Sequence, residues 1–254
     1  MTQTAEQLAA ELYDIFVPDW DGEIDFYRHL ARGVTAKGQP ILEVGCGTGR
    51  VAVRLAQDGA KVVGMDLDDE MLKVARGKSE DISWEHGDMR TFDLGQTFGL
   101  IILPGDSSQF MCTPEDQVNA LERFKHHLEP GGMLVVHLDH QSVEWLGNLT
   151  GKFEQVNDII HPRTENVIRK ENAWRYEPST QTAVVITRWH EIGKDGTILQ
   201  TWTRKPMSLH CVFRFEMEHL LARAGFEDRI VHGDFFKGEL KDDSLDMIWV
   251  AKNQ

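Results

Sequence analysis

The sequence predicts an α/β fold: a doubly wound, mostly parallel sheet of seven strands, with a helical lid before it and an antiparallel β insertion after the fifth strand. From residue 40 onward, short apolar runs alternate with helical patterns, which is typical of a parallel sheet covered by helices on both faces. After residue 150 the helical patterns stop, and β-branched and aromatic residues dominate up to residue 211, which indicates antiparallel strands.

The expected elements follow one another in a regular order. The strands of the parallel part are expected at residues 41–44, 61–66, 83–86, 100–103 and 133–139, and the helices between them at 49–57, 68–77 and 114–128. In the insertion we expect strands at 167–176, 182–192 and 197–207, the last two joined by a turn at Gly193-Lys194-Asp195-Gly196. A helix at 216–224 and strands at 228–233 and 244–252 then return to the main sheet.

The segment before the sheet is expected to be helical. Residues 5–32 have apolar positions at helical spacing, with a break at 17–22 that contains proline and glycine. We therefore divide the chain into a helical lid at 1–39, a core made of 40–149 and 212–254, and a substrate-side insertion at 150–211.

Composition excludes several classes of function. The net charge of -14 would repel phosphate backbones and argues against nucleic acid as a partner. No apolar run reaches the roughly 20 residues that a membrane helix needs. The first residues lack the basic and apolar blocks of a signal peptide, and the 3 cysteines have no metal-ligand spacing. We expect a cytoplasmic protein with reduced thiols and no metal site.

A glycine-rich loop follows the first strand of the sheet. Ile41-Leu42-Glu43-Val44 leads into Gly45-Cys46-Gly47-Thr48-Gly49-Arg50, and a helical pattern begins at once. Glycines at this place let the backbone turn sharply and approach a ligand, and Asp66 follows the next strand, so the pattern indicates a nucleoside pocket. A dinucleotide loop would need a third glycine where Arg50 stands. Glu43 suits a cationic ligand with an ammonium or sulfonium group.

The segment Glu43–Gly49 resembles the first signature of class I S-adenosylmethionine-dependent methyltransferases, which have a Rossmann-like fold. The resemblance continues through Val63–Asp66, Gly87-Asp88-Met89 and Leu128–Gly132, so that it covers residues 40–140 closely and 216–252 more loosely. It implies S-adenosylmethionine as the cofactor. The overall plan is similar to that of small-molecule N-methyltransferases, including those that act on amino sugars and glycine.

The resemblance also implies roles for particular residues. Gly45, Gly47 and Gly49 would lie against the methionyl part of the cofactor, with Cys46 as a spacer and Arg50 next to it. Glu43 would hold the ammonium group and Asp66 the ribose hydroxyls. The remaining expected contacts are Leu67 and Met71 on adenine, Asp88 and Met89 at its edge, Leu103 to Ser107 near the sulfonium, and Tyr13, Trp20 and Tyr27 from the lid.

A general base is needed only if the acceptor arrives protonated. The candidates are His140 and Asp139 at the end of the fifth strand and His190 in the insertion, followed by His210 and Glu191. The sequence favours no single one of them.

Several functions remain open at this point. The leading hypothesis is methyl transfer to nitrogen of a small molecule, with oxygen as the alternative acceptor atom. An NAD-dependent oxidoreductase is a second reading, against which Arg50 counts, and a cofactor-binding protein without turnover is a third. The sequence leaves the acceptor unidentified and a homodimer open.

Overall fold

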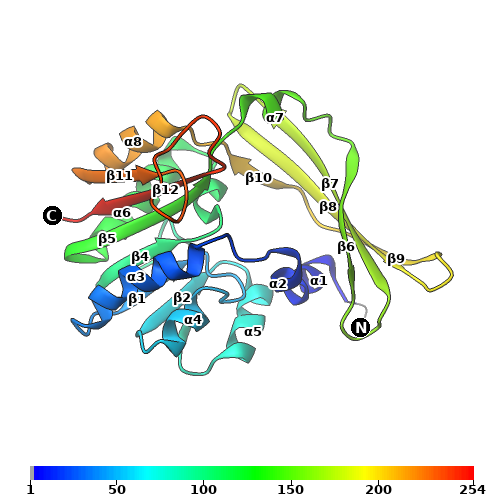
Figure 1. Ribbon diagram of the computed structural model, residues 1–254, viewed down its shortest axis with the longest axis horizontal. Coiled ribbons are helices and arrows are strands. Elements are labelled where there is room, and N and C mark those ends of the chain that lie inside the picture. Colours follow the sequence, from blue (N-terminus) through cyan, green and yellow to red (C-terminus); the bar gives the residue numbers. More distant parts are fainter. Residues whose placement is uncertain (1–2) are drawn as a thin grey trace. The chain divides into compact units, whose positions relative to one another are not determined.

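The computed structural model describes residues 3–254, and its elements are labelled in Figure 1. The chain forms two compact units. The residues up to Pro18 belong with Ser142–Cys211, and Asp19–Gln141 belongs with Val212–Gln254. The second pair of segments contains the main sheet and is called the core unit below; the first pair is called the insertion unit.

The core unit is built on a seven-stranded sheet with the order β11-β12-β5-β4-β1-β2-β3. The five neighbouring strands β5, β4, β1, β2 and β3 run parallel to one another. Strand β12 runs antiparallel to both of its neighbours, β5 and β11. This confirms the predicted fold class. The strands are β1 (Ile41–Val44), β2 (Val62–Asp66), β3 (Ser83–His86), β4 (Phe98–Leu103), β5 (Leu128–Asp139), β11 (Asp228–His232) and β12 (Asp246–Lys252).

Helices cover both faces of this sheet because successive strand residues point to opposite sides. Leu42 and Ile101 belong to one apolar cluster, together with residues of α6 and α8. Their chain neighbours Ile41 and Leu100 belong to a second cluster with residues of α3 and α4. The helices of the core unit are α3 (Glu23–Thr35), α4 (Ala52–Gln57), α5 (Asp69–Lys78), α6 (Pro114–His126) and α8 (Arg214–Arg223), with a 3-10 turn η1 (Ser107–Phe110).

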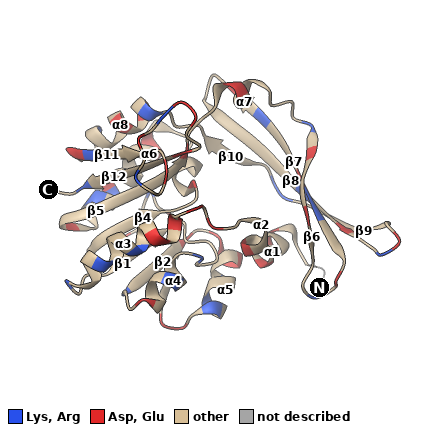
Figure 2. Cartoon of the chain, viewed as in Figure 1, with Lys and Arg blue, Asp and Glu red and all other residues tan. Residues whose placement is uncertain are grey.

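Local signals fix where these helices begin. The Asp68 carboxylate accepts hydrogen bonds from the first turn of α5, and the Thr113 hydroxyl caps α6, whose first residue is a proline. Figure 2 shows how charge is distributed over α3 and α5: acidic residues occupy the first turn and basic residues the last. That arrangement complements the helix dipole.

The insertion unit contains a five-stranded antiparallel sheet in which β10-β8-β7-β6 are neighbours and β9 also pairs with β8. Its apolar cluster joins Leu8 and Leu12 to Ile168, Trp189 and Trp202. The elements are α1 (Ala5–Glu11), α2 (Tyr13–Phe16), α7 (Val143–Gly147), β6 (Phe153–Ile160), β7 (Val167–Glu177), β8 (Thr182–Ile192), β9 (Ile198–Thr203) and β10 (Met207–His210).

The elements differ from expectation in four places. Strand β6 and helix α7 were not predicted, and the strand expected at 197–207 is two strands, β9 and β10. Strand β6 is largely exposed and pairs only with β7, so it carries little of the apolar pattern that reveals a strand. Strand β5 begins at Leu128 and includes Glu129–Gly132, which lie before the expected start at residue 133, and its register against β4 is irregular.

The helical start of the chain is divided between the two units. Helices α1 and α2 belong to the insertion unit, and α3 belongs to the core unit, with the break between them at residues 17–22 as expected. The role of residues 1–39 as a lid stays a prediction. Among residues 3–254, no helix is both long and apolar enough to span a bilayer.

Candidate functional site

The glycine loop joins β1 to α4 and takes its shape from its surroundings. Gly47 has a φ of 54°, and a Cβ atom placed on it would meet nothing within 4 Å. At Gly49, where φ is 76°, a Cβ would lie 2.4 Å from the Trp84 ring. At Gly45 it would lie 2.5 Å from the Ser107 hydroxyl. The loop therefore packs on the protein at both ends and presents its middle to open space.

Asp66, at the end of β2, ties this loop to the sheet. One carboxylate oxygen accepts a hydrogen bond from the Gly47 N–H at 2.7 Å, and the other accepts one from the Asp68 N–H at 2.8 Å. Burial raises the pKa of Asp66, and these backbone bonds oppose that shift. Because each carboxylate oxygen has two lone pairs, the group can accept further hydrogen bonds. Leu67 follows with 59% of its surface exposed.

Glu43 lies in β1 beneath the loop and is almost completely buried. Burial raises the pKa of Glu43 to about 8, and Arg50 opposes the shift. One of its carboxylate oxygens has no hydrogen-bond partner among the described residues. Cys46 is also buried, and burial raises the pKa of its thiol far above the ordinary value, so it is no nucleophile at neutral pH.

Arg50 forms a clamp between the loop and helix α3. Its guanidinium makes two hydrogen bonds to the Glu23 carboxylate, at 2.5 and 2.8 Å, and a third to Asp19 at 2.7 Å. It also lies over the Trp20 ring, 5.3 Å from the centroid. The Glu23 side chain is fully buried, so the pair is an internal one. The sequence did not single out Glu23, although an acid directly after the Gly22 turn is a helix-start signal.

A second loop, Pro104–Ser108, follows β4. His137 in the neighbouring strand β5 holds it: His137 Nδ1 accepts a hydrogen bond from the Gly105 N–H at 3.2 Å, and Nε2 donates to the Asp246 carboxylate at 2.9 Å. Burial lowers the pKa of His137, but Asp246 and Asp106 outweigh burial and raise it. The Trp20 ring packs edge-on against His137 with centroids 5.1 Å apart.

Asp106 lies in the segment from Leu103 to Ser107 that was expected near the sulfonium, although the sequence did not single out this residue. It has a φ of 63°, and its side chain accepts a hydrogen bond from the Asp139 N–H. Burial and the Asp139 carboxylate raise the pKa of Asp106 to about 7. Its Oδ1 atom is buried and has no partner among the described residues. The Ser107 hydroxyl next to it donates to the Pro104 carbonyl at 2.8 Å.

The structure brings together most of the expected cofactor residues of the core unit at the carboxyl ends of the strands. Asp88 lies after β3, where both of its oxygens bind Arg90, and Arg90 lowers the pKa of Asp88. Met71 in α5 is buried, and Met89 is partly buried. The Leu103 side chain lies in the apolar core, which leaves its backbone to face the loop side.

Tyr27, which was expected as a lid residue near the cofactor, lies in α3 of the core unit. It is completely buried and packs between Phe26 and Phe235. Its hydroxyl has no partner among the described residues. Burial raises the pKa of Tyr27, and the nearby Glu23 and Glu43 add to that shift.

The expected bases lie in different settings. His140 follows β5, and its Nδ1–H donates to the Ser244 carbonyl at 2.9 Å. Asp139 is exposed at the end of β5. In the insertion unit, His190 on β8 contacts the Thr201 hydroxyl at 2.8 Å and Glu171 at 3.3 Å. Of the other expected residues in that unit, Tyr13 lies in α2, Glu191 on β8 and His210 on β10.

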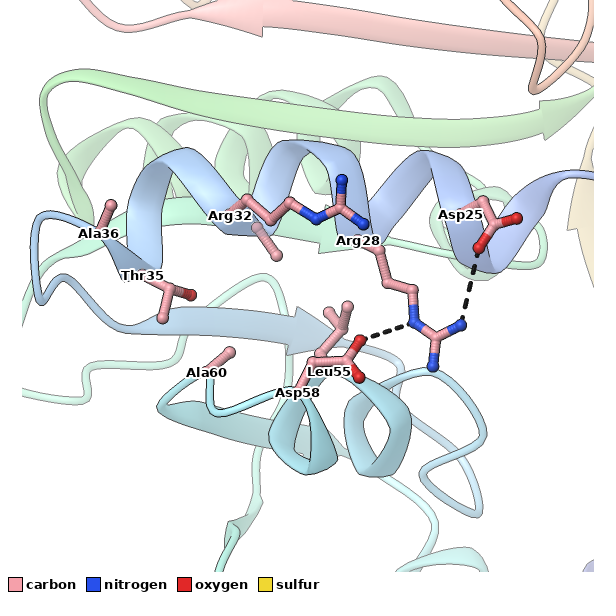
Figure 3. A pocket seen from close by; sticks show the side chains of 9 residues that line it. Asp25, Arg28, Arg32, Thr35, Ala36, Leu55, Asp58 and Ala60 are labelled. Atoms are coloured by element: carbon pink, nitrogen blue, oxygen red, sulfur yellow. Dashed lines mark hydrogen bonds and ion pairs between the residues drawn. The ribbon is translucent and has the colours of Figure 1, made fainter.

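A surface cavity of about 760 Å³ lies between α3 and α4, away from these strand ends (Figure 3). Arg28 lines this cavity and is bound to Asp58 at 2.6 Å and to Asp25 at 3.6 Å. None of the expected site residues lines this cavity. The candidate site is therefore the set of loops after β1, β2, β4 and β5.

Part of the core unit is similar to a known protein family. Residues 41–132 match the family model described as a methyltransferase domain. This segment is therefore similar to a methyltransferase domain. The matched segment covers the glycine loop, Asp66, Asp88 and the Pro104–Ser108 loop, and the match ends at Gly132 within β5.

The names of the relatives specify different methyl acceptors. The chain is 33% identical over 131 residues to dTDP-3-amino-3,4,6-trideoxy-alpha-D-glucopyranose N,N-dimethyltransferase of Streptomyces venezuelae, a match that covers 50% of this chain and 55% of that protein. The chain thus spans about half the length of the curated relatives of this kind that it matches. Glycine N-methyltransferase of Mus musculus is 25% identical over 266 residues, covering 92% of this chain and 86% of that protein.

Solved structures share the fold of the core unit and of the insertion unit. The CcbJ methyltransferase of Streptomyces caelestis has a TM-score of 0.76 at 23% identity and covers 100% of this chain and 99% of its own. DesVI of Streptomyces venezuelae has a TM-score of 0.74 at 21% identity, and the match covers 95% of this chain and 97% of DesVI. At these identities the likeness establishes the fold.

Proposed function

We propose that this protein is an S-adenosylmethionine-dependent methyltransferase that methylates an amino group of a small molecule. The observation that carries the proposal is the arrangement around Gly47: an open glycine backbone held by Asp66, with the unpaired Glu43 oxygen beneath the same loop. The names of the relatives, several of which are sugar N,N-dimethyltransferases, support nitrogen as the acceptor atom.

The residues of the site fit this cofactor in three respects. Asp66 keeps acceptor capacity for two ribose hydroxyls while its backbone bonds fix its orientation. The unpaired oxygen of Glu43 suits an ammonium group that lies near the loop. The exposed side chain of Leu67, next to Asp66, offers an apolar surface to adenine. When bound, the cofactor supplies an electrophilic methyl group on a sulfonium.

The protein's contribution is orientation and exclusion of water. Holding nucleophile and methyl group in line can lower the barrier by about 7–11 kcal/mol in favourable cases. Arg50 and Glu23 fix the glycine loop against α3, and His137 fixes the loop after β4. His140 is better placed than His190, because the His140 Nδ1–H donates to the Ser244 carbonyl and its Nε2 keeps a lone pair, whereas both ring nitrogens of His190 have partners.

Calorimetry with S-adenosylmethionine and S-adenosylhomocysteine tests the proposal. Both should bind, and Asp66→Ala should weaken binding by at least about ten-fold, because it removes charge-assisted hydrogen bonds worth about 1.5–3 kcal/mol each. Asp81→Asn, at an exposed position outside the site, is the matched control and should bind as the wild type does. NAD is titrated in parallel. Binding of NAD instead of either sulfur compound would reject the proposal.

Transfer of labelled methyl groups identifies the acceptor atom. The acceptors offered are glycine and the dTDP-3-amino sugars that the relatives' names specify, each beside its hydroxyl counterpart. We expect label on an amine. Label on the hydroxyl compounds alone would make oxygen the acceptor atom, and cofactor binding with no transfer to any of them would favour a protein without turnover.

A further inference from the structure

Two carboxylates meet at the ends of neighbouring strands. Strands β4 and β5 are adjacent and parallel, with Leu103 opposite Val136. Asp106 follows β4 by three residues, and Asp139 is the last residue of β5. The Asp139 N–H donates a hydrogen bond to the Asp106 side chain, so the two groups lie together at the edge where Gly45 and Ser107 also meet.

The backbone at Asp106 is held in an uncommon conformation. Its φ of 63° lies in the left-handed region, which residues other than glycine adopt uncommonly. The conformation is maintained from both sides, because the Gly105 N–H donates to His137 and the Gln109 N–H donates to the Asp106 carbonyl. A strained residue held by its neighbours in this way is typical of a functional position.

The surroundings of Asp106 carry an excess of negative charge. The ionisable groups that face it come from three elements: Asp139 and His137 on β5, Asp246 on β12 and Tyr27 on α3. His137 accepts the Gly105 N–H on Nδ1 and donates from Nε2 to Asp246, so in this geometry its ring is neutral.

Unpaired polar atoms in the same place point to a ligand. Asp106 Oδ1 is buried without a partner among residues 3–254, and so is the hydroxyl of the completely buried Tyr27. Burial raises the pKa of that hydroxyl, and the carboxylates of Glu23, Glu43 and Asp106 raise it further, in that order. Buried polar atoms are rarely left without hydrogen bonds in native proteins, so a donor from outside the chain is expected here.

We propose that Asp106 and Asp139 form the subsite for the amino group of the acceptor, and that Asp106 takes one proton from it. The proposal rests on the function proposed above and deepens it. Asp139 is exposed and receives the incoming ammonium, and the buried Oδ1 of Asp106 supplies a second acceptor. An ammonium supplies the hydrogen-bond donors that these acceptors lack.

The proton moves from the ammonium group to the carboxylate of Asp106. One N–H bond of the ammonium breaks, its electron pair stays on nitrogen, and an O–H bond forms on Asp106. The ammonium becomes a neutral amine with the lone pair that a nucleophile needs, and the carboxylate becomes a carboxylic acid. Burial and Asp139 raise the pKa of Asp106 to about 7, which brings it closer to that of an amine and favours the transfer.

Carbon-13 NMR of aspartate carboxyl groups tests this subsite. Methylammonium chloride is the probe, titrated with and without S-adenosylhomocysteine, and tetramethylammonium chloride, which has no N–H, is the matched salt. The Asp106 resonance, assigned with Asp106→Asn, should move with methylammonium and stay with the matched salt. Asp139→Asn should weaken the response by about ten-fold, equivalent to about 1.4 kcal/mol. Equal responses to the two salts would overturn the proposal.

The variants are chosen so that folding does not obscure the result. Asparagine adopts the left-handed conformation readily, so Asp106→Asn should keep the loop. Asp242→Asn, at an exposed position in the loop before β12, is the control and should leave the titration unchanged. Calorimetry with S-adenosylhomocysteine is read separately. Failure of that compound to bind contradicts the proposed function, and an unresponsive Asp106 in a protein that binds it contradicts the subsite alone.

Discussion

Arg50→Met removes the guanidinium that neutralises Glu23. The Arg50 side chain is 9% exposed and that of Glu23 is 0% exposed, so the carboxylate would be left buried without its partner. Breaking an internal ion pair in this way costs about 3–5 kcal/mol. We therefore expect the free energy of unfolding to fall by that amount. Urea unfolding followed by circular dichroism measures it.

Two further variants separate the pair from its surroundings. Arg54 also binds Asp19, but the two side chains are 37% and 36% exposed, so Arg54→Met should cost less than about 1 kcal/mol. The double variant Glu23→Gln with Arg50→Met leaves no buried charge and should recover most of the loss. If Arg50→Met were as mild as Arg54→Met, or if the double variant were no more stable than Arg50→Met, the reasoning would be refuted.

The remaining predictions concern the loop, Glu43 and the insertion unit. Gly47→Ala should cost about 1–2 kcal/mol of stability, because only its φ is strained, yet abolish cofactor binding in calorimetry; Gly49→Ala should destabilise more, because its Cβ meets Trp84. The raised pKa of Glu43, about 8, means that the folded state holds a proton that the unfolded state releases above its ordinary pKa of 4.5. Wild-type stability should therefore fall relative to Glu43→Gln as the pH rises from 5 to 8, by at most about 1.4 kcal/mol per pH unit, and parallel unfolding curves across that range would contradict it. Trp202→Ala should lower the stability of the insertion unit by about 3–5 kcal/mol in urea unfolding, because the ring is buried in its apolar cluster, and a loss below 1 kcal/mol would show that the cluster contributes little.

The parts of the fold that the sequence predicted are those with a strong local signal. The glycine loop and the acid after β2 have few alternative explanations, because glycine and carboxylate at strand ends serve a backbone turn and a ligand. The paired strands β7 and β8 were found almost to the residue, since their β-branched runs are flanked by turn residues.

The parts that the sequence missed depend on contacts between distant residues. Asp106 belongs to a loop that was expected near the ligand, but its left-handed conformation depends on His137, 31 positions further along the chain. Glu23 gains its importance from Arg50, which faces it only after folding. No pattern within a short window contains such information.

The place of β12 in the sheet has a consequence for how the chain is made. Strand β5 ends at Asp139, but its partner on one side, β12, begins only at Asp246, after the whole insertion. During synthesis from the amino terminus, one edge of this long strand therefore stays unpaired until residues 246–252 have left the ribosome. The length of the antiparallel insertion determines how long this edge stays unpaired, and pairing with β12 then covers it.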